Sequence, residues 1–303
     1  MLNRRAFSRN LAGAALAAEA AAARGSATED NPTSAPFQIS VMLWTVFKNL
    51  PFEQRLEKVV EAGYTNVELV GEYKKWQGDE FDRYNAKRKQ LGITFDTTAG
   101  LRHAIGNPAD RDGMLADVRN ELPIMEKLDC PSCIIMSGNV VPGMPRETQH
   151  QSCVEGLKRA ASLIEGKQIN GQPVRLLLEN IDPEENPKYY LTSVAEGFEI
   201  IRAVNHPQVQ FLYDFFHEQI SEGNLIEKLE KNIQYTGLVH IADVPGRHEP
   251  GTGEINYGNI YRKLAELKYN RMVAMEFLPS SDPVGKLRKA REDALRLTAA
   301  ASA

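Results

Sequence analysis

The stretch from Gly237 to Tyr257 reads GLVHIADVPGRHEPGTGEINY, and it indicates the fold more clearly than any other part of the chain. It opens with a short apolar run, which is typical of a buried strand. His240 lies near the end of that run. The polar loop that follows carries the charged or titratable residues Asp243, Arg247, His248, Glu249 and Glu254. A buried strand that delivers a His into such a loop is the pattern expected where a barrel strand meets an active site, although many strand-to-helix loops are polar without being functional.

The same alternation of apolar run and helical spacing continues through the chain. Strands are predicted at residues 38–43, 66–70, 93–97, 132–137, 174–179, 209–214, 237–242 and 271–277. Helices are predicted at residues 51–62, 80–91, 111–128, 146–168, 193–204, 225–231, 257–267 and 283–300. Eight strands that alternate with helices over this length predict an α/β protein with a single (β/α)8 TIM barrel.

A doubly wound open sheet is the main competing architecture for this alternation. Such sheets usually carry a glycine-rich turn after the first strand. Here the first predicted strand leads into LWTVF at residues 43–47, which contains no glycine. The run Gly251-Thr252-Gly253 lacks the third glycine of a nucleotide-binding turn. The barrel is therefore the favoured architecture.

Titratable residues end the last four predicted strands. They are Glu179, Asp214, His240 and Glu276. The carboxyl ends of barrel strands meet at one rim, so these side chains are expected to converge there. Three carboxylates and one imidazole suit a divalent cation such as Mn²⁺ or Mg²⁺, and a cation would relieve the repulsion between buried acids. Glu179 and Glu276 could then move a proton on a bound α-hydroxycarbonyl compound, one removing it and the other returning it.

Charge and composition narrow the class of partner. The net charge of -4 and the lack of a basic run argue against nucleic acid, whose binding depends on clustered Lys and Arg. No apolar stretch approaches the ~20 residues that a membrane span needs. A small-molecule partner is therefore expected, and a homo-oligomer is compatible with the sequence.

Residues 1–36 are expected to lie outside the catalytic domain, which spans residues 37–303. They combine Arg4-Arg5, an Ala/Leu-rich segment and a Ser/Thr/Pro-containing linker. The run NRRAFS at residues 3–8 resembles the Arg-Arg core of a twin-arginine export signal, which predicts a periplasmic or exported protein. A cytoplasmic protein with an Ala-rich tail is the alternative, and the charge of Glu19 inside the apolar segment favours it.

The three cysteines do not form a disulfide framework, because their number is odd. Cys130 and Cys133 have CxxC spacing, but Cys133 leads directly into an apolar run. It is predicted to be a core residue of a strand, with a redox role for the pair as the alternative.

Two long runs make this chain similar to the hydroxypyruvate isomerase branch of the xylose isomerase-like TIM barrels, a group that includes ketose 3-epimerases. They are YDFFHEQISEGNL at residues 213–225 and IADVPGRHEPGTGEINY at residues 241–257, with shorter matches around Glu179 and Glu276. The resemblance covers residues 37–280. It implies a divalent cation held by Glu179, Asp214, His240 and Glu276, with Glu179 and Glu276 as the proton-transfer pair.

The resemblance also suggests how substrate is held. His217 would reach a substrate oxygen, and Arg247 would bind a carboxylate or hydroxyl group. Glu185 matches a substrate-binding acid of the epimerases, or lies on a solvated loop. Trp44 and His103 are candidates for pocket lining. His240 occupies a position where hydroxypyruvate isomerases often have Gln. The epimerases have His at this position, as this chain does.

The expected reaction is the interconversion of hydroxypyruvate and tartronate semialdehyde through an enediolate. A ketose 3-epimerase would use a similar proton removal but return the proton to the same carbon. A DNA-repair endonuclease of the same barrel type would need a basic groove and more metal-binding His than the six in this chain. A non-catalytic envelope protein that binds sugar is the remaining alternative.

Overall fold

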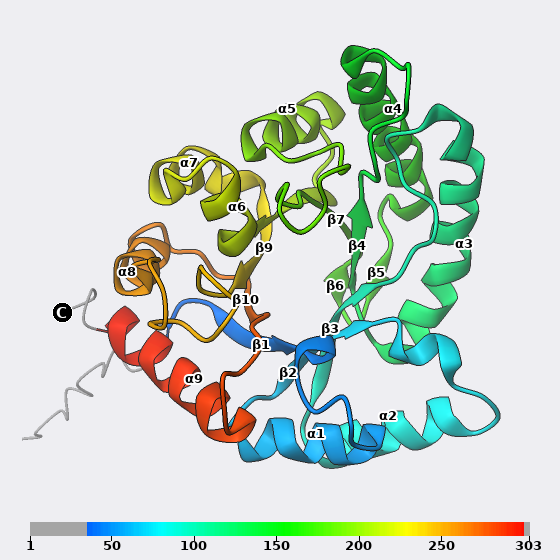
Figure 1. Ribbon diagram of the computed structural model, residues 1–303. Coiled ribbons are helices and arrows are strands. Elements are labelled where there is room, and N and C mark those ends of the chain that lie inside the picture. Colours follow the sequence, from blue (N-terminus) through cyan, green and yellow to red (C-terminus); the bar gives the residue numbers. More distant parts are fainter. Residues whose placement is uncertain (1–34, 300–303) are drawn as a thin grey trace, which may run out of the picture. The chain divides into compact units, whose positions relative to one another are not determined.

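The computed structural model describes residues 35–299, whose core is a closed barrel of eight parallel strands (Figure 1). The order around the barrel is β1-β10-β9-β8-β7-β4-β3-β2. The barrel strands are β1 (Gln38–Met42), β2 (Asn66–Val70), β3 (Thr94–Ala99), β4 (Ser132–Met136), β7 (Arg175–Glu179), β8 (Val209–Asp214), β9 (Thr236–Ile241) and β10 (Met272–Met275). The predicted barrel is confirmed. The predicted export signal and linker, residues 1–36, fall almost wholly outside the described residues.

Helices follow the strands along the chain and surround the barrel in Figure 1. They are α1 (Phe52–Glu61), α2 (Glu80–Gln90), α3 (Arg111–Leu128), α4 (Arg146–Ile164), α5 (Val194–Val204), α6 (Phe215–Ser221), α7 (Leu225–Asn232), α8 (Tyr257–Glu266) and α9 (Pro283–Ala299). Their apolar faces cover the outward side chains of the strands. In α1, for example, Leu56 and Val59 are fully buried, one turn apart.

Each strand presents alternate residues to the helices and to the barrel interior. The interior is filled by a small apolar cluster of Met42, Ile134, Leu177, Leu212, Leu238 and Ala274. Residues one position away along the same strands, such as Leu178 and Val239, belong to the larger core beneath the helices. This alternation fixes which side chains reach the carboxyl-end rim from inside the barrel.

Two segments differ from the prediction. Helix α4 ends at Ile164 and not at residue 168, and the chain then forms a small antiparallel hairpin of β5 (Gln168–Ile169) and β6 (Gln172–Pro173). Asn170 and Gly171 both have positive φ, of 48° and 73°, as a tight hairpin turn requires. Helix α6 was also not predicted, and it begins directly at the end of β8.

The three cysteines are free and buried, and Cys133 is a core residue of β4 as predicted. Within residues 35–299, no helix combines the length and apolar character that crossing a membrane requires.

Candidate functional site

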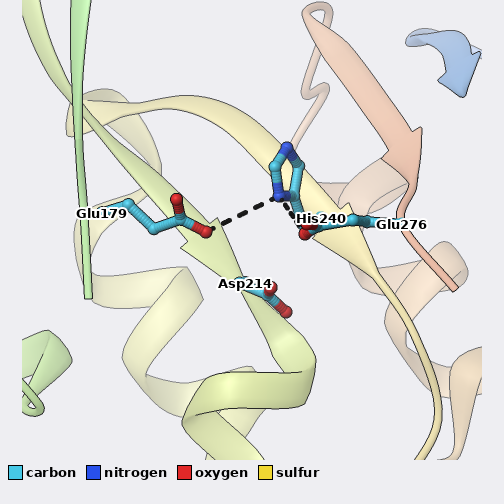
Figure 2. Close-up of side chains that lie close together, drawn as sticks. All are labelled: Glu179, Asp214, His240 and Glu276. Carbon is cyan, nitrogen blue, oxygen red and sulfur yellow. Dashed lines mark ion pairs between the residues drawn. The ribbon is translucent and has the colours of Figure 1, made fainter. Parts of the chain in front are cut away.

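Four side chains meet inside the barrel at the carboxyl ends of adjacent strands. Glu179 ends β7, Asp214 ends β8, His240 lies near the end of β9, and Glu276 directly follows β10. One potential ligand atom from each lies within 4.8 Å of the others (Figure 2). All four are buried. The structure therefore brings together the four residues that the strand ends singled out.

The period of two along each strand explains this convergence. Each of the four residues lies two positions after an apolar residue of the barrel interior, and these apolar residues are Leu177, Leu212, Leu238 and Ala274. Neighbouring strands are also in register, since Asp214 on β8 pairs with His240 on β9. Side chains at these positions must point inward at similar heights.

His240 lies at the centre of the group. Its Nδ1 is 2.7 Å from Oε2 of Glu276 and 3.7 Å from Oε1 of Glu179, the two ion pairs drawn in Figure 2. Its Nε2 lies 3.0 Å from Oε2 of Glu68 on β2. The imidazole therefore has a carboxylate on both sides, in a location with no exposure to solvent.

Several polar atoms of the group lack a hydrogen-bond partner within the described part of the chain. They are Oδ2 of Asp214, Nδ1 of His240 and Oε2 of Glu276, and all are buried. Buried polar atoms are normally hydrogen-bonded. These three have charged neighbours within 2.7–3.4 Å but no hydrogen bond of normal geometry, an arrangement that a bridging cation would complete. Carboxylate oxygens with one imidazole nitrogen are a suitable set for a divalent cation. The residues present thus fit a divalent metal ion.

Burial and neighbouring charge separate the two glutamates. Burial raises the pKa of Glu179 to about 8; His240 opposes this increase and Glu276 adds to it. Burial would also raise the pKa of Glu276, but Arg247 and His240 hold it well below its ordinary value. For His240, burial lowers the pKa, whereas Glu68 and Glu276 raise it well above the usual range. A cation among these groups would replace protons as the balancing charge.

Arg247 lies against the four-residue cluster from the loop after β9. Its guanidinium forms ion pairs with Glu276, at 2.8 Å, and with Glu185, and it lies 3.6 Å from Asp214. The rings of Trp44 and Phe216 lie close to the same guanidinium. Arg247 is only 7% exposed, whereas the side chain of Glu185 is 45% exposed. Of these two predicted substrate-binding residues, one is therefore enclosed in the site and the other lies at its edge.

His217, in the first turn of α6, is buried beside the cluster. Its Nδ1 lies 2.6 Å from Oδ2 of Asp182, and its Nε2 lies 3.4 Å from Oδ2 of Asp214. Burial lowers the pKa of His217, but Asp214 and Asp182 outweigh it and raise the pKa to about 9. Ligand atoms of His217, Asp182 and Glu185 also lie within 4.8 Å of one another. The structure thus places His217 beside the cluster, with a carboxylate facing each of its ring nitrogens.

The two carboxylate oxygens of Asp214 have different surroundings. Its Oδ1 accepts hydrogen bonds from the backbone N–H groups of Phe216 and His217, which caps the start of α6. Its Oδ2 is the buried atom without a hydrogen-bond partner. One carboxylate oxygen therefore supports the helix, and the other faces the cluster.

Trp44 and His103 were both candidates for pocket lining, and only Trp44 contacts the cluster. Its indole N–H donates a hydrogen bond to Oε1 of Glu276 at 2.8 Å. His103 pairs instead with Asp117 of α3, at 3.0 Å.

The charged loop between β9 and α8 has mixed roles. Asp243 accepts hydrogen bonds from the backbone N–H groups of Gly251 and Gly253, so it organises the loop itself. Glu249 accepts hydrogen bonds from Ser280 and ties this loop to the one after β10. Asp243 and Glu249 therefore serve the structure of these loops.

Sequence reasoning did not assign a role to Glu68 or Asp182. Glu68 occupies an interior position of β2, between Val67 and Leu69, which pack outward. The alternation of inward and outward residues along the strand therefore already places this acid inside the barrel. Asp182 lies in the loop after β7, where its pairing with His217 depends on contacts between distant segments.

Comparison with known proteins identifies the family. Residues 56–299 match the family model described as xylose isomerase-like TIM barrel. The chain belongs to this family. It is 30% identical over 238 residues to 2-oxo-tetronate isomerase of Pectobacterium atrosepticum, covering 77% of this chain and 89% of that protein. It is 29% identical to hydroxypyruvate isomerase of Escherichia coli, covering 83% of this chain and 97% of the relative.

Among solved structures, a protein named AP endonuclease, family 2, from Brucella melitensis superposes with a TM-score of 0.74 and 26% identity. The match covers 82% of this chain and 96% of that one. The relatives named as isomerases match this chain over most of their own length. The chain is accordingly an isomerase-like enzyme of the hydroxypyruvate isomerase type.

Proposed function

We propose that this protein is a divalent-cation-dependent isomerase of small 2-oxo acids, with hydroxypyruvate and tartronate semialdehyde as the substrate pair. The observation that carries the proposal is the convergence of Glu179, Asp214, His240 and Glu276 beside Arg247. A 2-oxo acid of four carbons, 2-oxo-tetronate, is acted on by two relatives according to their names. It contains the same hydroxyl, carbonyl and carboxylate groups, so it is the second substrate to test.

The four residues of the cluster would hold the cation. When bound, Mn²⁺ or Mg²⁺ would polarise the carbonyl and hydroxyl oxygens of the substrate and so acidify the C–H group between them. The three buried atoms of the cluster that make no hydrogen bond support this assignment.

Glu179 and Glu276 would transfer the proton. Both carboxylates face Nδ1 of His240 in Figure 2, and they come from β7 and from the end of β10, so two carboxylates from different strands face one small space. One carboxylate takes the proton from the carbon that bears the hydroxyl group, and an enediolate forms. The other donates a proton to the former carbonyl carbon, and the hydroxyl group that remains becomes a carbonyl. The hydroxyl oxygen gives up its proton as it becomes the carbonyl, and the former carbonyl oxygen gains one. The net change is the transfer of one hydrogen between neighbouring carbons and of one proton between their oxygens.

Arg247 and His217 would bind the substrate carboxylate. The guanidinium of Arg247 already pairs with the half-exposed Glu185, and a substrate carboxylate can take that place with the same fork geometry. His217, whose pKa is raised to about 9, adds a second positive group on the same side. A neutral ketose would leave these charges without a new partner, which is why an acidic substrate is favoured over an epimerase substrate.

A substrate panel tests this function. The purified protein is loaded with Mn²⁺ and incubated with hydroxypyruvate, 2-oxo-tetronate and several ketohexoses, and the products are followed by NMR. Turnover of a 2-oxo acid is expected. Turnover of the ketohexoses alone would support a 3-epimerase instead. Absence of all turnover, with ligand affinity retained in Glu179→Gln and Glu276→Gln, would indicate a binding protein.

We also propose that the catalytic domain spans residues 37–303 and that residues 1–36 direct export by the twin-arginine route. Support comes from the NRRAFS run at residues 3–8 and the Ala/Leu-rich segment after it. That route carries folded proteins, which suits an enzyme that must hold its cation before export.

A further inference from the structure

Glu68 lies on the side of His240 that faces away from the proposed cation. It belongs to β2, has no exposure to solvent, and places Oε2 3.0 Å from Nε2 of His240. The register of the barrel supports this contact, because Glu68 is paired with Met42 of β1 and so lies inside the barrel.

A buried carboxylate at this position needs an explanation. Burying an unpaired charge costs several kcal/mol, and an apolar residue would fill an interior strand position without that cost. Within residues 35–299, Glu68 has no Lys or Arg at ion-pair distance, and its ion-pair partner is His240. Its other oxygen, Oε1, has no hydrogen-bond partner in that range. The structure therefore gives Glu68 one specific interaction, which is the one with the imidazole.

We propose that Glu68 is a positioning residue that fixes the tautomer and orientation of His240 for cation binding. By accepting a hydrogen bond from Nε2–H, it leaves the lone pair of Nδ1 directed toward Glu179 and Glu276. Carboxylate partners of this kind orient metal-binding histidines and increase their basicity. The inference rests on the proposed cation site, and it assigns to β2 a part in that site.

Titration of the full chain with Mn²⁺ by calorimetry tests the inference. Glu68→Gln keeps the size of the side chain but removes the carboxylate, and Mn²⁺ affinity is expected to fall roughly 10- to 100-fold. Glu121→Gln is the matched control, because Glu121 is also a buried acid with a single side-chain partner, Tyr73, on a different element. Its Mn²⁺ affinity should equal that of the parent.

A double variant shows whether Glu68 acts through His240. In a His240→Asn background, adding Glu68→Gln should leave Mn²⁺ affinity unchanged, since the group that Glu68 positions is already gone. A further loss of the same size would overturn the inference. A purely structural role would instead lower the unfolding temperature of Glu68→Gln and leave its Mn²⁺ affinity at the parental value.

The cation site and the positioning role of Glu68 can be tested separately. If the parent protein binds no Mn²⁺, the cation site and the role of Glu68 fall together. If the parent binds Mn²⁺ and Glu68→Gln binds it equally well, only the role of Glu68 is wrong. Should Glu68→Gln fail to fold, Glu68→Asp draws the carboxylate back by one methylene, and parental Mn²⁺ affinity in that variant would also overturn the inference.

Discussion

Arg247 and Glu276 form a buried ion pair, with 2.8 Å between Nη2 and Oε2. The same guanidinium reaches Glu185 at the edge of the site. The backbone of Arg247 adopts the left-handed conformation, with φ of 54°, which is uncommon for a residue other than glycine. A positive group is thus held against the proposed proton-transfer residue, and it also contacts a half-exposed acid at the edge of the site.

Glu276→Gln should lower kcat by on the order of 10²-fold or more, because it removes a proton carrier and weakens the cation site. Steady-state kinetics with hydroxypyruvate and saturating Mn²⁺ measure this. Glu254→Gln is the control, since Glu254 is an exposed acid of the β9–α8 loop that contacts Gln219. Near-parental kcat in Glu276→Gln would show that Glu276 does not carry a proton.

Arg247→Ala should raise KM for acidic substrates much more than for any neutral ketose that is turned over. The reason is that a planar guanidinium binds a carboxylate through two parallel hydrogen bonds. Arg247→Lys keeps the charge without the fork, so it should recover only part of the loss. Equal losses on acidic and neutral substrates would contradict the carboxylate assignment.

Removal of the cation should abolish activity, and its return should restore both activity and stability. Dialysis against EDTA followed by addition of Mn²⁺ or Mg²⁺ tests this. At a free cation concentration of 100 Kd, binding should stabilise the fold by about 2.7 kcal/mol, visible as a higher Tm. Glu179→Gln, which lacks one proposed ligand, should show a much smaller increase in Tm on the same addition.

Glu249 should contribute to stability at neutral pH and lose that contribution in acid. Burial would raise its pKa, but Lys286 and Ser280 lower it to about 2, well below the ordinary value of a glutamate. Its contribution is therefore present above about pH 4.5 and disappears as pH falls toward 2. Urea unfolding of Glu249→Gln should show a loss of roughly 1–2 kcal/mol at pH 7 that shrinks as the pH falls from about 4.5 toward 2. The control Glu266→Gln, an exposed partner of Lys263, should change little at any pH.

Replacing Arg4 and Arg5 together by Lys should retain the protein in the cytoplasm of a bacterial host that has the twin-arginine route. Cell fractionation and immunoblotting measure the distribution. Replacing Arg24 and Lys48 by Gln and Arg, respectively, leaves the Arg pair intact and should not change export. Unchanged export of the Arg4/Arg5 variant would contradict the proposed signal.

Much of the fold could be predicted from the sequence because each strand and each helix has its own hydrophobic periodicity. Eight alternating strand–helix pairs are typical of a closed (β/α)8 barrel. The convergence of Glu179, Asp214, His240 and Glu276 followed from the same reasoning, since residues at the carboxyl ends of barrel strands share a rim. The hairpin at Asn170-Gly171 was missed although the Asn-Gly pair is a turn signal, because its flanking strands have two residues each.

The remaining contacts could not be read from local patterns. The interaction of Glu68 with His240 joins residues 172 positions apart, and that of His217 with Asp182 joins residues 35 positions apart. Both depend on the closure of the barrel and on how a loop folds over its rim. The interior position of Glu68 was visible in the strand pattern, but its partner was not.

The two oxygens of Asp214 have different contacts. One accepts hydrogen bonds from the first turn of α6, and the other faces the cluster. The helix start therefore does not rely on an ion to stay formed. We expect the protein without its cation to remain folded and to exchange one cation for another without refolding. The concentrations of Mn²⁺ and Mg²⁺ in the surrounding medium would then determine which cation the enzyme carries.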